Sequence, residues 1–208
     1  MRLFKRHPLS FAGLTAVIIV AELALNAIPV IGTIAGNIVV PVLACSLLYA
    51  TLAADRDDRP RLQHLIAPFA APAGAVGAVI VASLSVFAIQ WAVARAIGDI
   101  DLLSGEGMTA PDPFAILAIY GGGIAASLPL TLVPMLALFE GESPRDAFAG
   151  SLAAFMRNIP TFLVYGTISI ALAGIGLLTF GVALLLVVPL WAASSYAAWK
   201  DLFGLERR

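Results

Sequence analysis

Long apolar stretches alternate with short polar or charged segments along the whole chain. A membrane core of about 30 Å needs roughly 20 consecutive apolar residues, because an α-helix rises about 1.5 Å per residue. Six stretches meet this length, so the pattern predicts six transmembrane helices. Their predicted positions are residues 9–28, 30–54, 69–97, 114–139, 159–178 and 180–199.

The predicted helices pair into three hairpins, at residues of about 9–54, 69–139 and 159–199. The whole chain, residues 1–208, is then one integral membrane domain. We therefore predict an all-α fold, a polytopic membrane helical bundle in which six transmembrane helices form three hairpins. Cytoplasmic amphipathic helices at the membrane interface are expected between the hairpins, at about residues 59–67 and 144–157.

The second interfacial helix has a start signal as well as an apolar face. Ser143 can cap a helix whose first residue is Pro144, and Asp146 at the third position completes a variant of the capping box. Apolar residues then follow at helical spacing, as is typical of a helix lying in the membrane plane: Phe148, Leu152, Phe155 and Ile159. The earlier connection repeats the pattern with Leu62, Leu65, Ile66 and Phe69.

Prolines recur at two kinds of position. The first kind opens an apolar stretch beside a cationic or amphipathic segment: Pro8, Pro68 and Pro160. The second kind follows a valine inside an apolar stretch, where it removes a helical hydrogen bond and predicts a kink: Pro41, Pro134 and Pro189. This recurrence favours an internal repeat of the hairpin, and kinks in a tightly packed bundle are favoured over moving hinges.

Composition supports a membrane protein and excludes several other classes. With 61% hydrophobic and 12% charged residues and a mean hydropathy of +0.97, the chain is not an ordinary soluble domain. A net charge of −1 without a basic face gives no indication of nucleic-acid binding. The single cysteine, Cys45, excludes an intramolecular disulfide and a multi-cysteine metal site.

Positive charge sets the predicted orientation, because lysine and arginine in short loops stay on the cytoplasmic side. A cytoplasmic N-terminus leaves only Arg95 near the outer side and also makes the C-terminus cytoplasmic. The outer segment 98–113 is acidic and carries no base. All other cations then lie inside: Arg2, Lys5, Arg6, Arg56, Arg59, Arg61, Arg145, Arg157, Lys200, Arg207 and Arg208.

Three runs in the second half of the chain carry a family resemblance: P-M-L-A-L-F-E-G-E-S-P-R-D-A-F from Pro134, F-M-R-N-I-P-T-F from Phe155 and V-P-L-W-A-A-S-S-Y-A-A-W-K-D-L-F from Val188. They resemble a family of bacterial six-span inner-membrane proteins, known as transmembrane proteins of unknown function. That family is distantly similar to the membrane domains of some glycerophosphodiester phosphodiesterases. The resemblance extends to I-P-V-I-G at residues 28–32. It implies a multi-pass protein of the bacterial cytoplasmic membrane, and no catalytic motif comes with it.

Few polar side chains lie at membrane depth, and these form the candidate site. Glu22 is the only acid inside a predicted span, and Arg95 is a partner by depth. Ionisable groups in a membrane are candidates for function, although an ion pair or a protonated, inward-facing carboxyl explains Glu22 more simply. Asn26, Asn37 and Gln90 could line a cavity with Glu22, but hydrogen bonding between helices is the simpler explanation.

No pattern in the sequence indicates a cofactor, a metal or a catalytic centre. The acidic run D-I-D at 99–101, followed by Glu106, lacks the ligand number and spacing of a calcium loop. His7 and His64 stand outside any metal-binding or catalytic motif. We therefore predict no cofactor and no metal, and a protein that is not an enzyme.

Two functional hypotheses follow. The first is a non-enzymatic accessory protein, or a factor acting on lipid or the cell envelope. The second is a small permease or transport subunit with a polar cavity around Glu22, supported by the repeat and the broken helices. Both place the chain in a lipid bilayer, and a membrane-protein partner or a homo-oligomer is compatible with either. A cavity that reaches Glu22 would favour transport.

Overall fold

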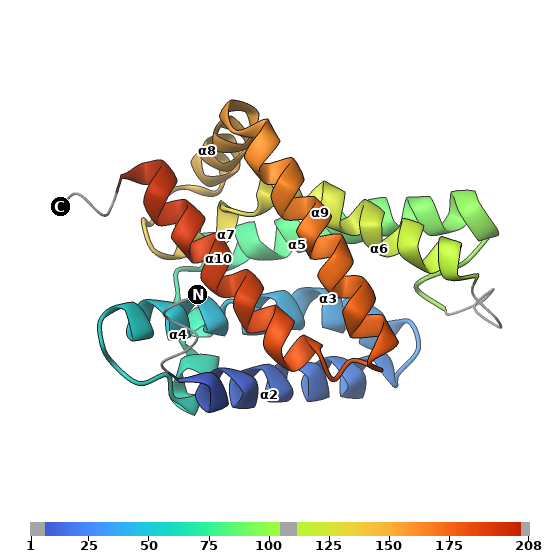
Figure 1. Ribbon diagram of the computed structural model, residues 1–208, viewed down its shortest axis with the longest axis horizontal. Coiled ribbons are helices and arrows are strands. Elements are labelled where there is room, and N and C mark those ends of the chain that lie inside the picture. Colours follow the sequence, from blue (N-terminus) through green and yellow to red (C-terminus); the bar gives the residue numbers. More distant parts are fainter. Residues whose placement is uncertain (1–6, 105–111, 205–208) are drawn as a thin grey trace.

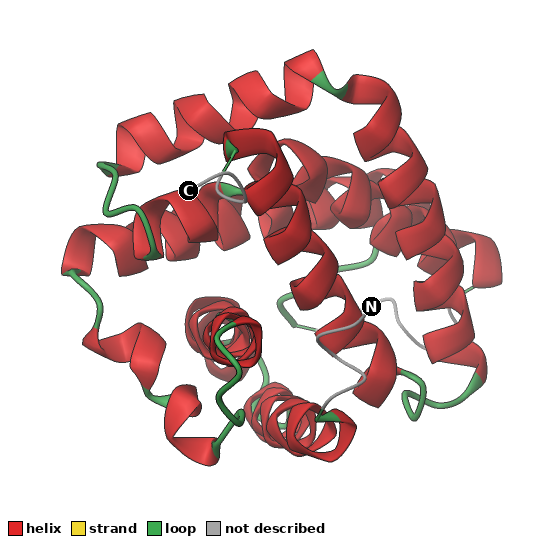
Figure 2. Ribbon diagram, turned by 60° about the vertical axis from the view of Figure 1, so that its left-hand side comes forward, coloured by secondary structure: helices red, strands yellow, loops and turns green. Residues whose placement is uncertain are grey.

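The computed structural model describes residues 7–104 and 112–204, and within these ranges all regular structure is helical. Figure 2 shows the helices joined by short loops. The long elements are α2 (Pro8–Asn26), α3 (Ile31–Ala44), α4 (Ser46–Asp55), α5 (Ala73–Gly98), α6 (Pro113–Ser127), α8 (Pro144–Arg157), α9 (Ile159–Leu178) and α10 (Leu184–Phe203); shorter ones are η1 (Leu62–Leu65), η2 (Ala67–Ala70), η3 (Leu128–Leu130) and α7 (Val133–Leu138).

Five helical segments are long and apolar enough to cross a membrane: Pro8–Asn26, Ile31–Asp55, Ala73–Gly98, Pro113–Leu130 and Ile159–Leu178. The chain is therefore an all-α bundle with five candidate membrane spans. The sixth predicted span corresponds to α10, which has 20 residues. It begins four residues later than predicted and is less apolar, because its last turns contain Tyr196, Trp199, Lys200 and Asp201.

Neighbouring long helices pack as antiparallel pairs, as a hairpin architecture requires. The helix α2 packs against α3, α5 against α6, and α9 against α10. The helix α5 also contacts α3 and α7, and α10 contacts α2 and α4. The red helix α10 thus crosses the blue first hairpin in Figure 1, so the first and last parts of the chain lie side by side.

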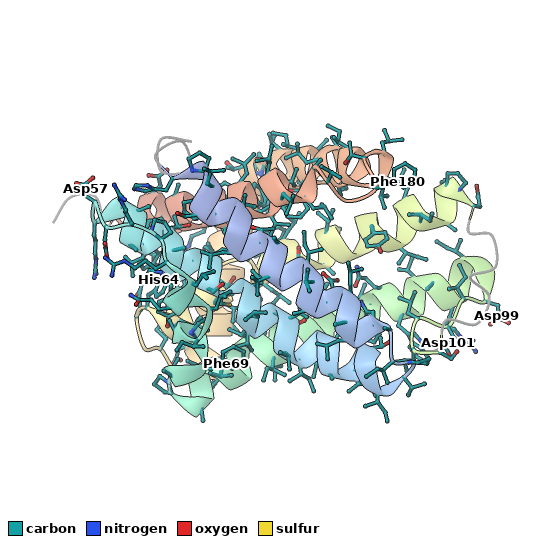
Figure 3. The ribbon with its side chains drawn as sticks, turned by 90° about the horizontal axis from the view of Figure 1, so that it is seen from below. Asp57, His64, Phe69, Asp99, Asp101 and Phe180 are labelled. Carbon is teal, nitrogen blue, oxygen red and sulfur yellow. The ribbon has the colours of Figure 1, made fainter. Side chains whose placement is uncertain are left out.

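The loops divide between two ends of the bundle. Figure 3 places Asp57 and His64 at one end and Asp99, Asp101 and Phe180 at the other. The first end carries the connection between the first two hairpins, and the second end carries turns within hairpins. This is the arrangement expected if the long helices run back and forth across a membrane.

The predicted span 114–139 is not one helix, because it is broken into α6, η3 and α7. Pro129 and Pro134 both lie in this region, and each lacks the N–H that a continuous helix needs. Pro134 occupies the first turn of α7, a position where proline is favoured. The kink predicted at Pro134 is therefore a helix start, whereas Pro41 lies inside α3 and Pro189 inside α10 as predicted.

The predicted interfacial helix at residues 59–67 is also wrong, because two short 3-10 helices, η1 and η2, take its place. Pro60 and Pro68 bracket this segment, and Pro72 precedes α5, so a regular α-helix has no uninterrupted stretch in which to form. Pro68 lies in η2 and does not open the third span. By contrast, Pro8 begins α2 and Pro160 lies in the first turn of α9.

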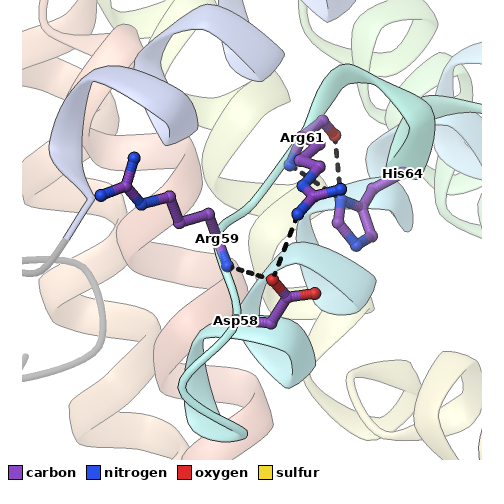
Figure 4. A network of polar contacts seen from close by, with 4 residues as sticks. All are labelled: Asp58, Arg59, Arg61 and His64. Atoms are coloured by element: carbon purple, nitrogen blue, oxygen red, sulfur yellow. Dashed lines mark hydrogen bonds and ion pairs between the residues drawn. The ribbon is translucent and has the colours of Figure 1, made fainter.

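A local polar network fixes the chain before η1 (Figure 4). The Asp58 carboxylate accepts a hydrogen bond of 2.7 Å from the Arg59 backbone N–H and lies 3.8 Å from the Arg61 guanidinium. The Arg61 backbone N–H in turn donates to Nδ1 of His64 over 2.9 Å. His64 therefore caps η1, which is a structural role on an exposed surface.

The helix predicted at residues 144–157 is confirmed as α8, with its predicted cap, whereas its place at a membrane interface stays a prediction. The Ser143 hydroxyl accepts from the Asp146 backbone N–H over 3.3 Å and donates to the Asp146 carboxylate over 2.6 Å. The fully buried residues of α8 are small, namely Ala147, Ser151 and Ala154, and Phe148 and Phe155 of the predicted apolar face are partly buried against the core. Leu152 stays exposed on the outer side.

Candidate functional site: a central cavity

A cavity of about 380 Å³, open on one side to the outside of the bundle, lies where the proline-containing helices meet. Pro41 and Pro134 line it, as does Val188, the residue before Pro189. Residues of α3, α4, α5, α6, η3, α7, α9 and α10 contribute to its wall. The three Val-Pro pairs that recur in the sequence thus converge on one place.

The cavity lies about halfway between the two ends of the bundle. Its lining comes from the middle of the long elements: residues 41–48 of α3 and α4, 79–86 of α5, 165–169 of α9 and 188–195 of α10. Because each residue adds about 1.5 Å along a helix axis, these positions lie at a similar level, near the middle of the candidate membrane spans.

Small side chains explain why space remains there. Ala44 and Cys45 follow Pro41, and Ala192 and Ser195 follow Pro189, and all four line the cavity. Ala82 does the same from α5. These residues allow close approach of backbones, and where the proline-containing helices diverge they leave a hollow. In the structure these small residues form part of the cavity wall.

The wall is largely apolar, with several hydroxyl groups. The Tyr165 hydroxyl of α9 lies 3.2 Å from the Ser195 hydroxyl of α10. The Ser127 hydroxyl donates to the Ile124 carbonyl, and the Thr131 hydroxyl donates to the Ser127 carbonyl, each about one helical turn earlier. Among the described lining residues, no aspartate, glutamate, histidine, lysine or arginine occurs. A wall without a charged side chain among its described residues suits a neutral molecule better than a charged one.

One lining group is conspicuous, the indole of Trp191. Its Nε1 is buried and has no hydrogen-bond partner among the described residues. Buried N–H groups are almost always paired, and leaving one unpaired costs about 1–3 kcal/mol. This nitrogen is not accessible from the cavity, so Trp191 lines the cavity with its apolar ring atoms.

An aromatic cluster packs at one end of the bundle, beyond the cavity. Phe139 stands edge-on to Tyr49, with ring centroids 5.0 Å apart, and lies 5.7 Å from Trp199. Tyr196 completes the group at 5.5 Å from Trp199. Aromatic pairs in such geometries contribute about 0.5–1.5 kcal/mol beyond the area that they bury. The cluster joins α4, α7 and α10.

Polar contacts reinforce this cluster. Asp55, the last residue of α4, accepts hydrogen bonds from the Lys200 ammonium at 2.8 Å and the Tyr196 hydroxyl at 3.0 Å. The Trp199 indole donates to the Glu140 carboxylate at 2.7 Å. Trp199 and Glu140 are separated by 59 positions in the chain, and Lys200 and Asp55 by 145 positions. They tie the first hairpin and α7 to the last helix.

Ser151 of α8 forms hydrogen bonds with the backbone where the fourth apolar stretch is interrupted between α6 and α7. Its hydroxyl donates to the Pro129 carbonyl over 2.7 Å and accepts from the Leu132 backbone N–H over 3.2 Å. Both groups belong to the short segment where the α-helix is interrupted. In a membrane, freed backbone groups need partners within the protein, so α8 completes the fold of its neighbour. The sequence indicated a serine on an amphipathic helix, but gave no indication of this contact.

The predicted polar site does not assemble at the cavity. Glu22 is exposed on α2 and lies within electrostatic range of Tyr120 on α6. Asn26 ends α2 with its side-chain oxygen close to Gly36, and Asn37 donates to the Thr33 carbonyl over 2.9 Å. None of these side chains lines the cavity.

Gln90 and Arg95 are engaged elsewhere on α5 and its C-terminal end. The Gln90 side chain covers Gly123 of α6, where any added Cβ would clash with it. Arg95 forms an ion pair of 3.2 Å with Asp99, one turn further along the chain. We predicted Arg95 as a partner of Glu22 from their similar depth. In the structure Arg95 instead pairs with Asp99, which is only four residues away in the chain.

The described acidic residues of the outer segment serve local structure. The Asp101 carboxylate accepts from the Leu103 backbone N–H at 2.8 Å and from the Trp91 indole at 3.3 Å. These hydrogen bonds lower the pKa of Asp101 below its usual value. Asp112 caps α6 through the Phe114 N–H. Glu106 lies outside the described residues, and within those ranges no cluster of three metal-binding side chains occurs.

Comparison with protein-family models, with curated proteins and with solved structures gave no match. The cavity and its surroundings must therefore be interpreted from their own chemistry.

Proposed function

We propose that the protein is a non-enzymatic, multi-pass protein of a bacterial cytoplasmic membrane that acts on lipid or envelope organisation or as an accessory subunit. The observation that supports this role most directly is the neutral, mainly apolar wall of the central cavity. An ion-coupled site at this depth would need charged groups facing the cavity, and none lines its described wall. Membership of the six-span inner-membrane family is part of the same proposal.

We further propose that α10 is a sixth span and that both termini are cytoplasmic. A helix of 20 residues is about 30 Å long, which matches the membrane core. The start of α2 and the end of α10 both lie toward the left of Figure 1, as does the loop after α4. The cations of the described inter-hairpin segments favour the cytoplasm for this end.

The permease hypothesis is the weaker alternative. It relied on Glu22, Asn26, Asn37 and Gln90 facing one cavity, whereas none of them lines the central one. A cavity at mid-depth among broken helices remains a feature of transporters, but its wall offers no coupling group. The geometry therefore favours binding of a neutral lipid-soluble molecule over transport of a polar one.

Topology and copurification together test this proposal. Single cysteines at Asp57 and Asp99, introduced into a Cys45→Ala background, would be probed in intact cells with a membrane-impermeant maleimide. We expect labelling at position 99 and protection at position 57. Native mass spectrometry of the purified protein should detect bound lipid or a stoichiometric membrane partner. The reverse labelling pattern would refute the orientation, and a protein free of lipid and partner would refute the role.

A further inference from the structure

We propose that the central cavity holds an acyl tail of a membrane phospholipid, whose headgroup stays at the membrane surface. This assignment rests on the proposed function, because a tail reaches the cavity only if the bundle lies in a membrane. It deepens that function by naming the ligand class, a flexible hydrocarbon chain, and the place where it binds.

The wall of the cavity lies at the depth of lipid tails. By helical rise, Pro41, Val86 and Ile124 lie about 15–18 Å from the ends of α3, α5 and α6 on the Asp99 side of the bundle. A hydrocarbon core of about 30 Å has its centre about 15 Å below either surface. In a membrane, the side of the cavity that is open to the outside of the bundle therefore faces hydrocarbon.

The aromatic cluster around Phe139 separates the cavity from the loops at the other end of the bundle. Phe139 and Trp199 come four residues after the lining residues Met135 and Ser195, which is about one helical turn. The rings of Phe139 and Trp199 pack 5.7 Å apart, and Trp199 is buried. A ligand therefore enters the cavity from the membrane and not from this end.

The chemistry of the wall suits a hydrocarbon chain better than water. No charged side chain lines the described wall. The Ser127 and Thr131 hydroxyls donate to backbone carbonyls, and the Tyr165 and Ser195 hydroxyls lie 3.2 Å apart. A buried water needs about two to four polar partners, and apolar cavities stay dry. A hydrocarbon chain needs no polar partner and restores the dispersion contacts that an empty space loses.

The volume of the cavity fits part of a lipid. At about 380 Å³ it is near the lower limit of small-molecule sites, so a whole phospholipid is too large. A single tail is unbranched and flexible, and the membrane presents tails at the open side of the cavity. One tail can therefore occupy the cavity while the polar headgroup of the same lipid keeps its hydration.

Trp191 provides a reporter inside the cavity. Its ring atoms line the wall, whereas Trp91 and Trp199 are not lining residues. Bromine atoms on a lipid tail quench tryptophan fluorescence only at close contact. The full chain would be placed in nanodiscs of phosphatidylcholine that carries bromine near the free end of one tail. Matched nanodiscs contain the same lipid without bromine, or with bromine close to the headgroup.

Variants at the cavity and matched controls locate the site. Trp191→Phe removes the reporter and keeps an aromatic ring, and Trp91→Phe is its control. Ser83→Leu adds volume at the cavity wall, and Ser85→Leu makes the same change on the exposed side of the same helix. Ala44→Leu fills the cavity from α3, which keeps the test decisive if Ser83→Leu does not fold. Circular dichroism checks the fold of every variant.

We expect bromine near the free end of the tail to quench the wild type more strongly than bromine near the headgroup. Trp191→Phe should lose most of this difference, and Trp91→Phe should keep it. Ser83→Leu should reduce the quenching of Trp191 roughly fivefold or more, because overpacking of the cavity excludes the tail. Ser85→Leu should leave the quenching unchanged. Acrylamide, a water-soluble quencher, should not quench Trp191.

Undiminished quenching in a folded Ser83→Leu or Ala44→Leu variant would overturn the assignment, because tails would then touch Trp191 without entering the cavity. Quenching of Trp191 by acrylamide would overturn it by showing that the cavity is open to water. Absence of quenching by brominated tails would overturn it as well. The proposed function would survive these results if the expected topology and copurifying lipid or partner were observed. It would fail independently if they were not.

Discussion

At the scale of single residues, two positions matter because of their contacts with the backbone of a neighbouring segment: one forms hydrogen bonds with it, and the other leaves space for it. Ser151 pairs with both sides of the break near Pro129. Gly32 lies where α3 begins against the end of α2, and a Cβ there would come 1.8 Å from the Leu25 carbonyl oxygen. Neither role follows from hydropathy, because a serine and a glycine are common in any membrane helix.

Ser151→Ala should destabilise the fold by about 2–4 kcal/mol, because it leaves a buried carbonyl and a buried N–H without a partner. Reversible unfolding in mixed micelles would measure the change. Ser85→Ala is the matched control, since its hydroxyl bonds only to the Val81 carbonyl in its own helix. Equal losses for the two variants would contradict the bridging role.

Gly32→Ala should prevent normal closure of the first hairpin, because the added carbon overlaps a backbone oxygen that cannot move freely. A loss of more than about 2 kcal/mol is expected, in line with overpacking of a tight site. Gly13→Ala, in open space on α2, should be neutral or stabilising by up to about 1 kcal/mol. Thermal unfolding of both variants gives the comparison, and a tolerated Gly32→Ala would refute the close contact.

Glu142 supplies a prediction about pH. Burial, aided by nearby Glu140 and Asp146, raises the pKa of Glu142 above its usual value. A carboxyl whose pKa is raised by folding favours the folded state below its unfolded pKa and loses that contribution as pH rises through the folded value. Glu142→Gln should therefore be more stable than wild type at pH 7, with the difference vanishing below about pH 4.5. A difference that does not change with pH would contradict this account.

At the scale of elements, the two segments that connect the predicted hairpins show how propensity and packing combine. The cap and the proline predict α8 from sequence, whereas the prolines at 60, 68 and 72 limit residues 62–70 to two 3-10 helices. The helix α8 uses a face of small residues against the protein and leaves Leu152 and Met156 exposed. We interpret that exposed apolar side as facing lipid.

Nitroxide labels at two adjacent positions of α8, in a Cys45→Ala background, test this orientation. A label at Leu152 should collide mainly with oxygen, which concentrates in lipid. A label at Ala153, which shares a helix face with Asp146 and Arg157 by its spacing, should collide mainly with a water-soluble relaxant. Power-saturation spectra measure both. Similar accessibility at the two positions would mean that α8 does not lie at the interface.

At the scale of the whole molecule, the bundle is closed by contacts between its first and last parts. Asp55, Tyr196 and Lys200 connect α4 with α10, next to the aromatic cluster around Phe139. The ion pair is mostly shielded from solvent, with 28% of the Asp55 side chain and 21% of the Lys200 side chain exposed. Partly buried charges of this kind are costly to leave without a partner.

A double-mutant cycle with Asp55→Asn and Lys200→Met should reveal this coupling. We expect each single change to destabilise, and the double variant to be less affected than the sum, with a coupling of about 1–3 kcal/mol. Lys200→Met paired with Asp57→Asn is the control, because Asp57 lies in the exposed loop. Additive effects at positions 55 and 200 would show that the pair does not join the hairpins.

The sequence by itself determined the helical class, the positions of most long helices and the cap of α8. These features depend on hydropathy, proline and local capping, which act over one or a few turns. The recurring Val-Pro pairs singled out Pro41, Pro134 and Pro189 in the sequence. Only the structure showed that Pro41, Pro134 and Val188, the neighbour of Pro189, line one cavity. Glu22 drew attention as the only acid inside a span, yet the structure directs it away from that cavity. Which faces meet depends on packing between segments far apart in the chain, and hydropathy has no information about such partners.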